Sequence, residues 1–123
     1  KLGGPAMNGL YATMTVQNPY LDAASQPVRF WATKYQTKFN EEPTVFSVYG
    51  YFIIDTFAKV AAKAGPGLNT DSFIKVMDTL TLEPDMFGGA KMTFSPTKRL
   101  GSDSSRLSQI TDGKWKVVSD YFN

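Results

Sequence analysis

The stretch FSVYGYFIIDTFAKVAAKAG, residues 46–65, is the most apolar part of this 123-residue chain. Its length and alanine content favour a helix over a strand. Lys59 and Lys63 lie near its end, where positive charge suits the negative pole of a helix, and Gly65-Pro66 provides a cap and a stop. We expect one broad buried face, made of Ile54, Phe57, Ala58, Ala61 and Ala62.

Two further amphipathic helices are predicted on either side of it. The first follows Pro27, and its apolar residues recur at spacings of three and four: Val28, Trp31, Tyr35 and Phe39. The second spans residues 69–80 and begins with an Asn/Thr cap signal. Its apolar face comprises Phe73, Met77 and Leu80. We expect both apolar stripes to lie in a core.

Strand patterns lie at both ends of the chain. Residues 10–16 alternate between apolar and polar side chains, and Met92 and Phe94 face alike in a later strand. Asp112-Gly113 separates two alternating runs, which is a strong hairpin signal. The predicted order is therefore strand, three helices and three strands. One strand gives three wide apolar helices little sheet to cover, so the helices suit a partner surface that this chain does not contain.

Composition excludes several classes of function. With 13 basic and 11 acidic residues the net charge is +2, too balanced to indicate a nucleic-acid partner. The densest basic patch, residues 97–106, also contains Asp103, and we expect a solvated loop there. The chain has no His and no Cys, which removes the commonest general base and thiolate chemistry. The adjacent pair Glu41-Glu42 precedes a proline and fits a loop, so it is a poor candidate for a catalytic carboxylate pair. We therefore expect no enzyme, and neither a metal nor a cofactor.

The length of the apolar runs and the identity of the first residue give two indications of where the protein is located. No apolar run approaches the roughly 20 residues that a membrane span needs. The chain opens on Lys1, without Met or a leader. We infer that a leader was removed or that the chain was cut from a longer protein.

Six segments occur in an order typical of one family. They are GGPAMNGLYATM, KYQTKFNEEP, YGYFIIDTFAKVAAKAG, NTDSFIKVMDTL, GGAKMTFSP and SQITDGKWKVVS. At these spacings the chain resembles the C-terminal third of type I periplasmic solute-binding proteins. The most similar branch is the leucine/isoleucine/valine-binding family, which serves ABC importers. The likeness covers essentially all 123 residues.

The resemblance implies an α/β fold, with a parallel sheet and flanking helices in each lobe of a two-lobed parent protein. Ligand binds between the lobes, which close on it by a hinge motion. By analogy, residues 1–41 belong to lobe 2 as a strand and a helix, and residues 42–85 to lobe 1 as two helices. Residues 86–123 return toward lobe 2 and form the C-terminal hairpin. The chain is then a C-terminal fragment.

The same resemblance implies the partners and the location. The partners are a small-molecule ligand, the membrane permease of an ABC transporter and the missing N-terminal part of the same protein, without nucleic acid. A further option is that the fragment forms an intertwined homo-oligomer with copies of itself. The implied location is periplasmic or extracytoplasmic, with the signal peptide outside this chain.

Asn8 bears on the ligand class. In amino-acid binders that the chain resembles, a carboxylate before the first strand grips the ligand's ammonium, and the matching position is Asn8, ahead of Gly9-Leu10. There is no Asp or Glu before Asp22. A buried ammonium without a counter-charge is costly, so we expect a small carboxylic acid, with an aromatic acid among the candidates, and an amino-acid-like solute stays open as the other option. The alternative is that Asn8 serves only as a turn residue.

Three aromatic residues at the start of the long helix, Phe46, Tyr49 and Tyr51, are expected to form an apolar wall for that ligand. The alternative is that they only pack. The family often has Tyr-Asp-Ala where this chain has Tyr51-Phe52-Ile53, which weakens the transfer of a role to Tyr51. Ser/Thr side chains and backbone N–H groups that would hold the carboxylate are expected outside this chain.

Two other functions stay open at this point. One is a ligand-sensing domain with the same fold, which signals to a receptor instead of a permease. The other is an independent α+β interaction domain without a small ligand. That last hypothesis predicts a cooperative, monomeric fold for residues 1–123 alone.

Overall fold

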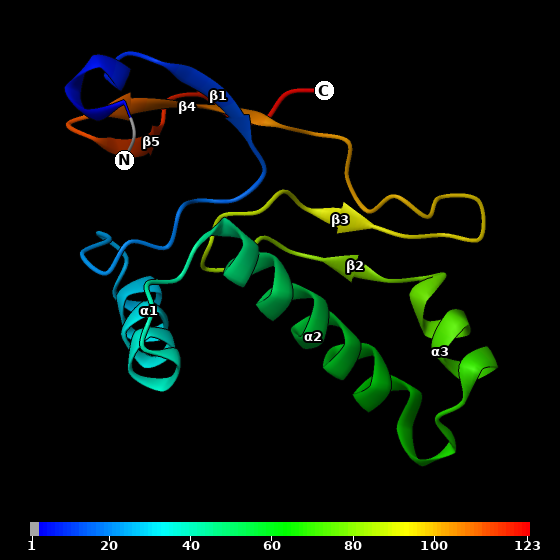
Figure 1. Ribbon diagram of the computed structural model, residues 1–123. Coiled ribbons are helices and arrows are strands. Elements are labelled where there is room, and N and C mark those ends of the chain that lie inside the picture. Colours follow the sequence, from blue (N-terminus) through cyan, green and yellow to red (C-terminus); the bar gives the residue numbers. More distant parts are fainter. Residues whose placement is uncertain (1–2) are drawn as a thin grey trace.

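The structure, a computed structural model, describes residues 3–123. Its elements are η1 (Gly4–Met7), β1 (Tyr11–Met14), α1 (Gln26–Phe39), α2 (Val45–Ala64), η2 (Gly65–Gly67), α3 (Thr70–Met77), β2 (Thr81–Leu82), β3 (Met92–Thr93), β4 (Arg106–Thr111) and β5 (Lys114–Val117) (Figure 1). The predicted strand, three helices and terminal hairpin occur in the predicted order. Sequence patterns missed β2, because two residues are too few to show alternation.

Both sheets are antiparallel. The larger has the order β1-β4-β5, and the smaller consists of β2 and β3. Thr111 lies opposite Lys114, and the turn between them has φ of 52° at Asp112 and 74° at Gly113. Two positive φ angles are what a tight two-residue hairpin turn requires, so the Asp-Gly signal is explained. Parallel strand pairs, expected for the parent protein, do not occur among residues 3–123.

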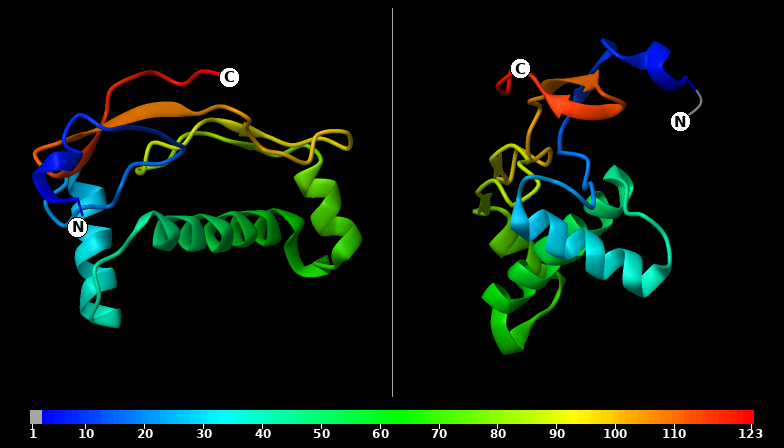
Figure 2. Two further views of the ribbon diagram at one scale, coloured as in Figure 1. Left: turned by 45° about the horizontal axis from the view of Figure 1, so that its top comes forward. Right: turned by 90° about the vertical axis from the view of Figure 1, so that its left-hand side faces the viewer.

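The chain forms two groups of elements that meet near the start of α2. One group is the three-stranded sheet with η1, and the other is α2, α3 and the β2-β3 ribbon (Figure 1). Helix α2 runs alongside the ribbon, and α3 closes its far end (Figure 2). The loop between β2 and β3 returns to the segment after β1, where Gln17 N donates to Phe87 O at 2.9 Å.

The core consists of two small clusters. The first joins α1, the start of α2 and the β2-β3 loop through Val28, Val48 and Phe87, with Trp31 against them. The second joins α2, α3 and the ribbon through buried residues and their partly buried neighbours: Val60, Leu80, Leu82, Phe52, Phe73, Val76, Met77, Met92 and Phe94. Because Phe87 is fully buried, its loss would remove the centre of the first cluster.

The buried stripe of α2 differs from the predicted one. Val48 and Val60 are fully buried, and Phe52 packs between the strands and α3. In contrast, Ile54 is 67% and Phe57 52% exposed, so the expected buried face is wrong for this chain. The ribbon covers one stripe of α2, and on the other stripe Phe57 meets Phe73 of α3 with ring centroids 5.4 Å apart, while Ile53 and Ile54 stay exposed.

Helix α2 with η2, Val45–Gly67, is long and apolar enough to cross a membrane by length and composition, with a mean hydropathy of 1.3. This corrects the expectation that no apolar run approaches that length. The most apolar part of this helix is 11% buried in the structure. A helix that covers a protein sheet passes the same test, so composition alone does not assign α2 to a membrane.

The chain exposes more surface than a compact monomer of its size. Its accessible area is 8268 Å², whereas a 13.6 kDa monomer exposes roughly 6,600 Å². Large apolar residues contribute to the excess, including Phe30, Phe46, Ile53, Ile54 and Phe57. Residues 3–123 therefore leave uncovered the apolar surface that a free-standing domain would bury.

Candidate ligand-binding site

Asn8 lies between η1 and β1 and contacts the hairpin turn. Its Oδ1 accepts a hydrogen bond from Gly113 N at 3.0 Å, and its own N–H donates to Pro5 O at 3.1 Å. These contacts fasten the entrance of β1 to the turn between β4 and β5. They account for an Asn at this position, and a ligand contact at Asn8 stays a prediction.

Phe46, Tyr49 and Tyr51 do not form one wall. Phe46 and Tyr49 meet edge to face with ring centroids 6.0 Å apart, whereas Tyr51 packs against Trp31 at 5.7 Å and Phe87 at 5.9 Å. On a helix, residues three apart are neighbours and residues two apart are not, which explains the division. Tyr49 reaches the residue that follows the first strand, through a 2.9 Å hydrogen bond between its hydroxyl and Thr15 Oγ1.

Asn8 and the aromatic residues lie at opposite ends of β1. Asn8 precedes the strand, and Thr15, which binds Tyr49, follows it. Seven residue steps lead from Asn8 to Thr15, and at about 3.3 Å per extended residue they span about 23 Å. The structure therefore does not bring the four predicted site residues together.

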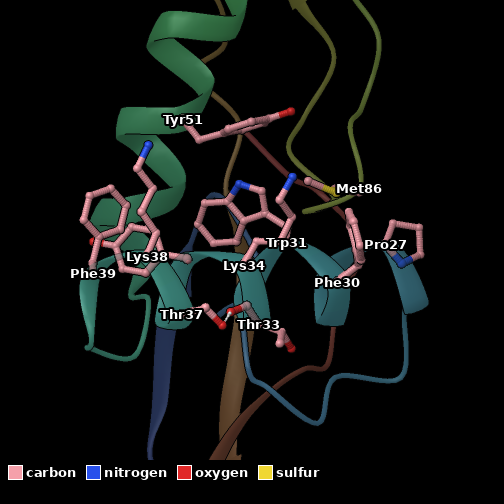
Figure 3. Close-up of a pocket in the computed structure, with 11 residues that line it drawn as sticks. Pro27, Phe30, Trp31, Thr33, Lys34, Thr37, Lys38, Phe39, Tyr51 and Met86 are labelled. Carbon is pink, nitrogen blue, oxygen red and sulfur yellow. Dashed lines mark hydrogen bonds between the residues drawn. The ribbon is translucent and has the colours of Figure 1, made fainter.

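A large apolar groove lies beside Tyr51. Its volume is about 780 Å³, and it runs along α1 over Trp31, Phe30 and Phe39 (Figure 3). Lys34 and Lys38 lie over the rings of Phe30 and Phe39 at 5.3 and 5.6 Å. The sequence predicted this aromatic stripe as core, yet Phe39 is 54% exposed. A strong aromatic stripe thus marks a surface that the described residues leave open.

Several segments meet where β1 ends, and we call this place the junction: Thr15, Gln17, Gly88, Arg106 and Tyr121. The Tyr121 hydroxyl lies 2.8 Å from Thr15 O and 2.6 Å from Gly88 O, as a donor to both carbonyls. Burial raises the pKa of Tyr121 above its ordinary 10.0, although the guanidinium of Arg106 beside it acts in the opposite direction. The phenol therefore stays neutral and keeps its proton for these carbonyls.

Arg106 corrects the prediction that residues 97–106 form a solvated loop. Thr97 to Leu100 are exposed, but Arg106 is only 9% exposed and opens β4 opposite Met14. Its guanidinium carbon lies 4.8 Å from the centre of the Tyr121 ring. Sequence reasoning missed both residues, because Arg106 stands at the end of a polar run and Tyr121 follows the last predicted strand.

Comparisons with known proteins give a consistent result. The sequence profile of a family described as "Periplasmic binding protein" matches residues 1–114. A solved structure from Rhodospirillum rubrum, provisionally assigned to a branched-chain amino acid ABC transporter, shares 23% identity with a TM-score of 0.67, over 95% of this chain and 32% of that one. A provisionally assigned leucine/isoleucine/valine-binding protein from Rhodopirellula baltica SH 1 shares 21% identity with a TM-score of 0.60, over 94% and 31%.

These likenesses establish the fold and its extent. At identities of 21–23% the two solved structures indicate the architecture of this chain and do not indicate its ligand. The chain spans about a third of the length of each of them. No curated protein gives a significant match to the sequence.

Proposed function

Because this chain belongs to the periplasmic binding protein family, we propose that it forms the C-terminal part of an extracytoplasmic solute-binding component of an ABC importer. The match over residues 1–114 is the observation that carries this proposal. The chain has the α/β fold of type I periplasmic binding proteins, and both structural neighbours are named for branched-chain amino acid transport or binding. The permease of that importer is the proposed protein partner.

The excess exposed surface supports the view that this chain is one part of a two-lobed parent protein. We propose that the β1-β4-β5 sheet belongs to lobe 2 and that α2 and α3 belong to lobe 1. Since β3 pairs with β2, we place the return to lobe 2 after β3 rather than at residue 86. The uncovered stripe of α2 then packs on a sheet contributed by the rest of the parent. An independent α+β interaction domain predicts instead a cooperative, monomeric fold for residues 1–123 alone, which an unfolding curve of the isolated chain tests.

We propose that the ligand is a small carboxylic acid. Residues 1–21 contain no Asp or Glu, so this part of the chain offers no counter-charge to a ligand ammonium. In the family that the chain resembles, the carboxylate side chain that binds a ligand ammonium stands at the position of Asn8. The proposed ligand contacts remain Asn8, Phe46, Tyr49 and Tyr51, of which Tyr49 is linked to β1.

We propose that the role is binding without catalysis, because the family whose profile matches residues 1–114 is described as a binding protein. We propose that closure of the two lobes on the solute delivers it to the permease, and that no chemical step occurs in the site.

A thermal-shift panel on the parent protein tests this function. Leucine, valine and phenylalanine are compared with benzoate and with aliphatic carboxylates of similar size. We expect the midpoint to rise with the concentration of an acid that lacks an amine, because ligand that binds only the folded state stabilises it by mass action. Strong stabilisation by leucine or valine, with none by the acids, would contradict the proposed ligand class but not the family.

A further inference from the structure

Two groups of elements in this chain are hydrogen-bonded to each other at one place. The sheet group comprises η1, β1, β4 and β5, with residues 15–17 after β1 and the C-terminal tail, residues 118–123, and the helix group comprises α2, α3 and the β2-β3 ribbon with its loop. Within residues 3–123 three hydrogen bonds join them, all at or beside the junction: Gln17 N to Phe87 O, Thr15 to Tyr49, and Tyr121 to Gly88. None of the described ion pairs joins the two groups. Two bodies whose hydrogen bonds gather at one place can change their relative angle about it.

The side chain of Tyr121 is fixed to the sheet group. Phe122 and Ser105 exchange two backbone hydrogen bonds of 2.8 Å, which fasten the tail to the residue before β4. The guanidinium carbon of Arg106, the first residue of β4, lies 4.8 Å from the centre of the Tyr121 ring. Because both of these neighbours lie at the start of β4, the Tyr121 hydroxyl moves with the sheet group.

The loop that accepts from Tyr121 is fixed to the helix group. Gly88 N donates to Asp85 O at 3.0 Å, and Phe87 N donates to Asp85 Oδ1 at 2.9 Å. The Phe87 side chain is fully buried and packs with Val48 of α2. The Gly88 carbonyl therefore points in a direction that the helix group determines, and its bond to Tyr121 depends on how the two groups are placed.

The two groups pack at Gly88 without spare space. A Cβ built on Gly88 would lie 2.9 Å from Arg106 Nη2 and 3.1 Å from Gln17 Nε2, well inside the roughly 3.5–4.0 Å at which nonbonded heavy atoms pack best. Its φ of +65° also favours glycine. Any side chain at Gly88 would therefore push the sheet group away from the loop.

The Tyr121 hydroxyl has one proton for two carbonyl groups. Thr15 O lies 2.8 Å away in the same group, and Gly88 O lies 2.6 Å away in the other group. Two acceptors can share one hydrogen in a three-centre bond. With Phe at this position the two carbonyl oxygens, both partially negative, would face a ring without a donor. The hydroxyl thus favours the arrangement in which Thr15 and Gly88 lie close together.

We propose that Tyr121 is a positioning residue of the parent protein, which sets the angle between the two lobes by holding Thr15 and Gly88 on one hydroxyl. This inference rests on the proposed function, in which the sheet group belongs to lobe 2 and the helix group to lobe 1. It adds a residue that adjusts the lobe arrangement without touching the solute. Since a solute binds only the competent fraction of the protein, a change in the lobe populations changes the apparent affinity for any solute.

Spin-label distances in the ligand-free, full-length parent protein, measured by pulsed dipolar spectroscopy, test the assignment. Labels at Lys63→Cys, near the end of α2, and Lys116→Cys, in β5, lie at exposed positions of the two groups. The chain itself contains no other Cys to be labelled. We expect Tyr121→Phe to lower the population at the wild-type distance, relative to all other distances, by about twofold to tenfold, the range for one neutral hydrogen bond.

Two further variants sharpen the test. Gly88→Ala should change the distances in the same direction as Tyr121→Phe, because its Cβ separates the groups. Tyr35→Phe is the matched control: the Tyr35 hydroxyl donates to Glu41 at 2.9 Å, which does not join the two groups, so the wild-type distances should persist.

Each other outcome has a defined meaning. Wild-type distances in Tyr121→Phe, together with a lowered free energy of unfolding in urea, would give Tyr121 a purely structural role and overturn the assignment. An equal change of the distances in Tyr35→Phe would overturn it as well. If no solute of the thermal-shift panel binds, the proposed ligand class fails while this inference does not, because the distances are measured without solute.

Discussion

The junction and helix α2 are both incomplete, but they lack different things. At the junction, Arg106 is buried beside the Tyr121 ring, and its Nε and Nη2 atoms donate no hydrogen bond within residues 3–123. Along α2, Ile54 and Phe57 are exposed although they are apolar. A buried charge requires a specific, oriented group, whereas an exposed apolar stripe requires only area. The comparison separates a place that lacks a specific hydrogen-bonding group from a surface that lacks only a covering one.

The largest expected effect comes from breaking the cluster that connects the two regions. Phe87→Ala should destabilise the parent protein by about 3–5 kcal/mol, since Phe87 is fully buried against α1 and α2. Urea unfolding measures the change. Leu100→Ala, at a residue 66% exposed, is the control and should shift stability by about 0.5 kcal/mol or less. A small effect of Phe87→Ala would show that the junction does not depend on this cluster.

The next prediction concerns the uncovered stripe of α2. Ile54→Asp should cost about 3 kcal/mol in the parent protein, where the proposed lobe 1 sheet covers Ile54, because a buried carboxylate lacks a partner there. The isolated chain should not be destabilised, and its binding of the dye ANS should fall. Unfolding curves and dye fluorescence of both proteins make the comparison. Equal tolerance in parent and isolated chain would mean that nothing covers this stripe.

A smaller effect is expected at Tyr121. Tyr121→Phe removes the hydrogen bond to Thr15 O and Gly88 O and should cost about 1 kcal/mol near neutral pH. Its folded-state pKa is raised, so its contribution is complete below the unfolded value of 10.0 and is lost as pH rises through the folded value. Melting curves of both proteins between pH 8 and 11.5 should therefore converge at high pH. Parallel curves would show that the phenol does not titrate with unfolding.

The smallest effect is expected at Asn8. Asn8→Ala removes the acceptor of Gly113 N at an exposed site and should cost about 0.5–1 kcal/mol. Asn8→Asp keeps an acceptor oxygen and should retain most of that stability. Thermal melts of the parent protein compare the two variants. A loss in both would indicate that the amide of Asn8 has a further partner.

The elements themselves could be predicted from local sequence. Asn69 caps α3 by accepting from Ser72 N at 3.0 Å, and Asn40, with a φ of 55°, ends α1, as turn and cap chemistry predicts. These are interactions within a few residues. The buried face of α2 could not be predicted, because it depends on which stripe meets β2 and β3. Composition showed only that α2 is apolar on more than one side.

The junction could not be predicted from the sequence either, because its residues are far apart along the chain. Arg106 and Gly88 are 18 positions apart, and Tyr121 binds Thr15 across 106 positions. A polar run such as residues 97–106 is typical of a solvated loop, and nothing in it marks its last residue as buried. The pairing of β4 with β1 places Arg106 opposite Met14, and only that register reveals the buried charge.

The composition of α2 has a consequence for export. If the parent protein is secreted as proposed, Val45–Gly67 must pass through the secretion channel without being retained as a membrane anchor. Each Asp or Lys near the middle of a spanning segment raises the cost of lipid insertion by about 2.5–3.5 kcal/mol. Asp55 occupies such a position and forms an ion pair of 2.6 Å with Lys59, one turn later in the folded helix. The same pair that is partly exposed in the folded protein thus favours release of α2 from the channel over retention in the bilayer.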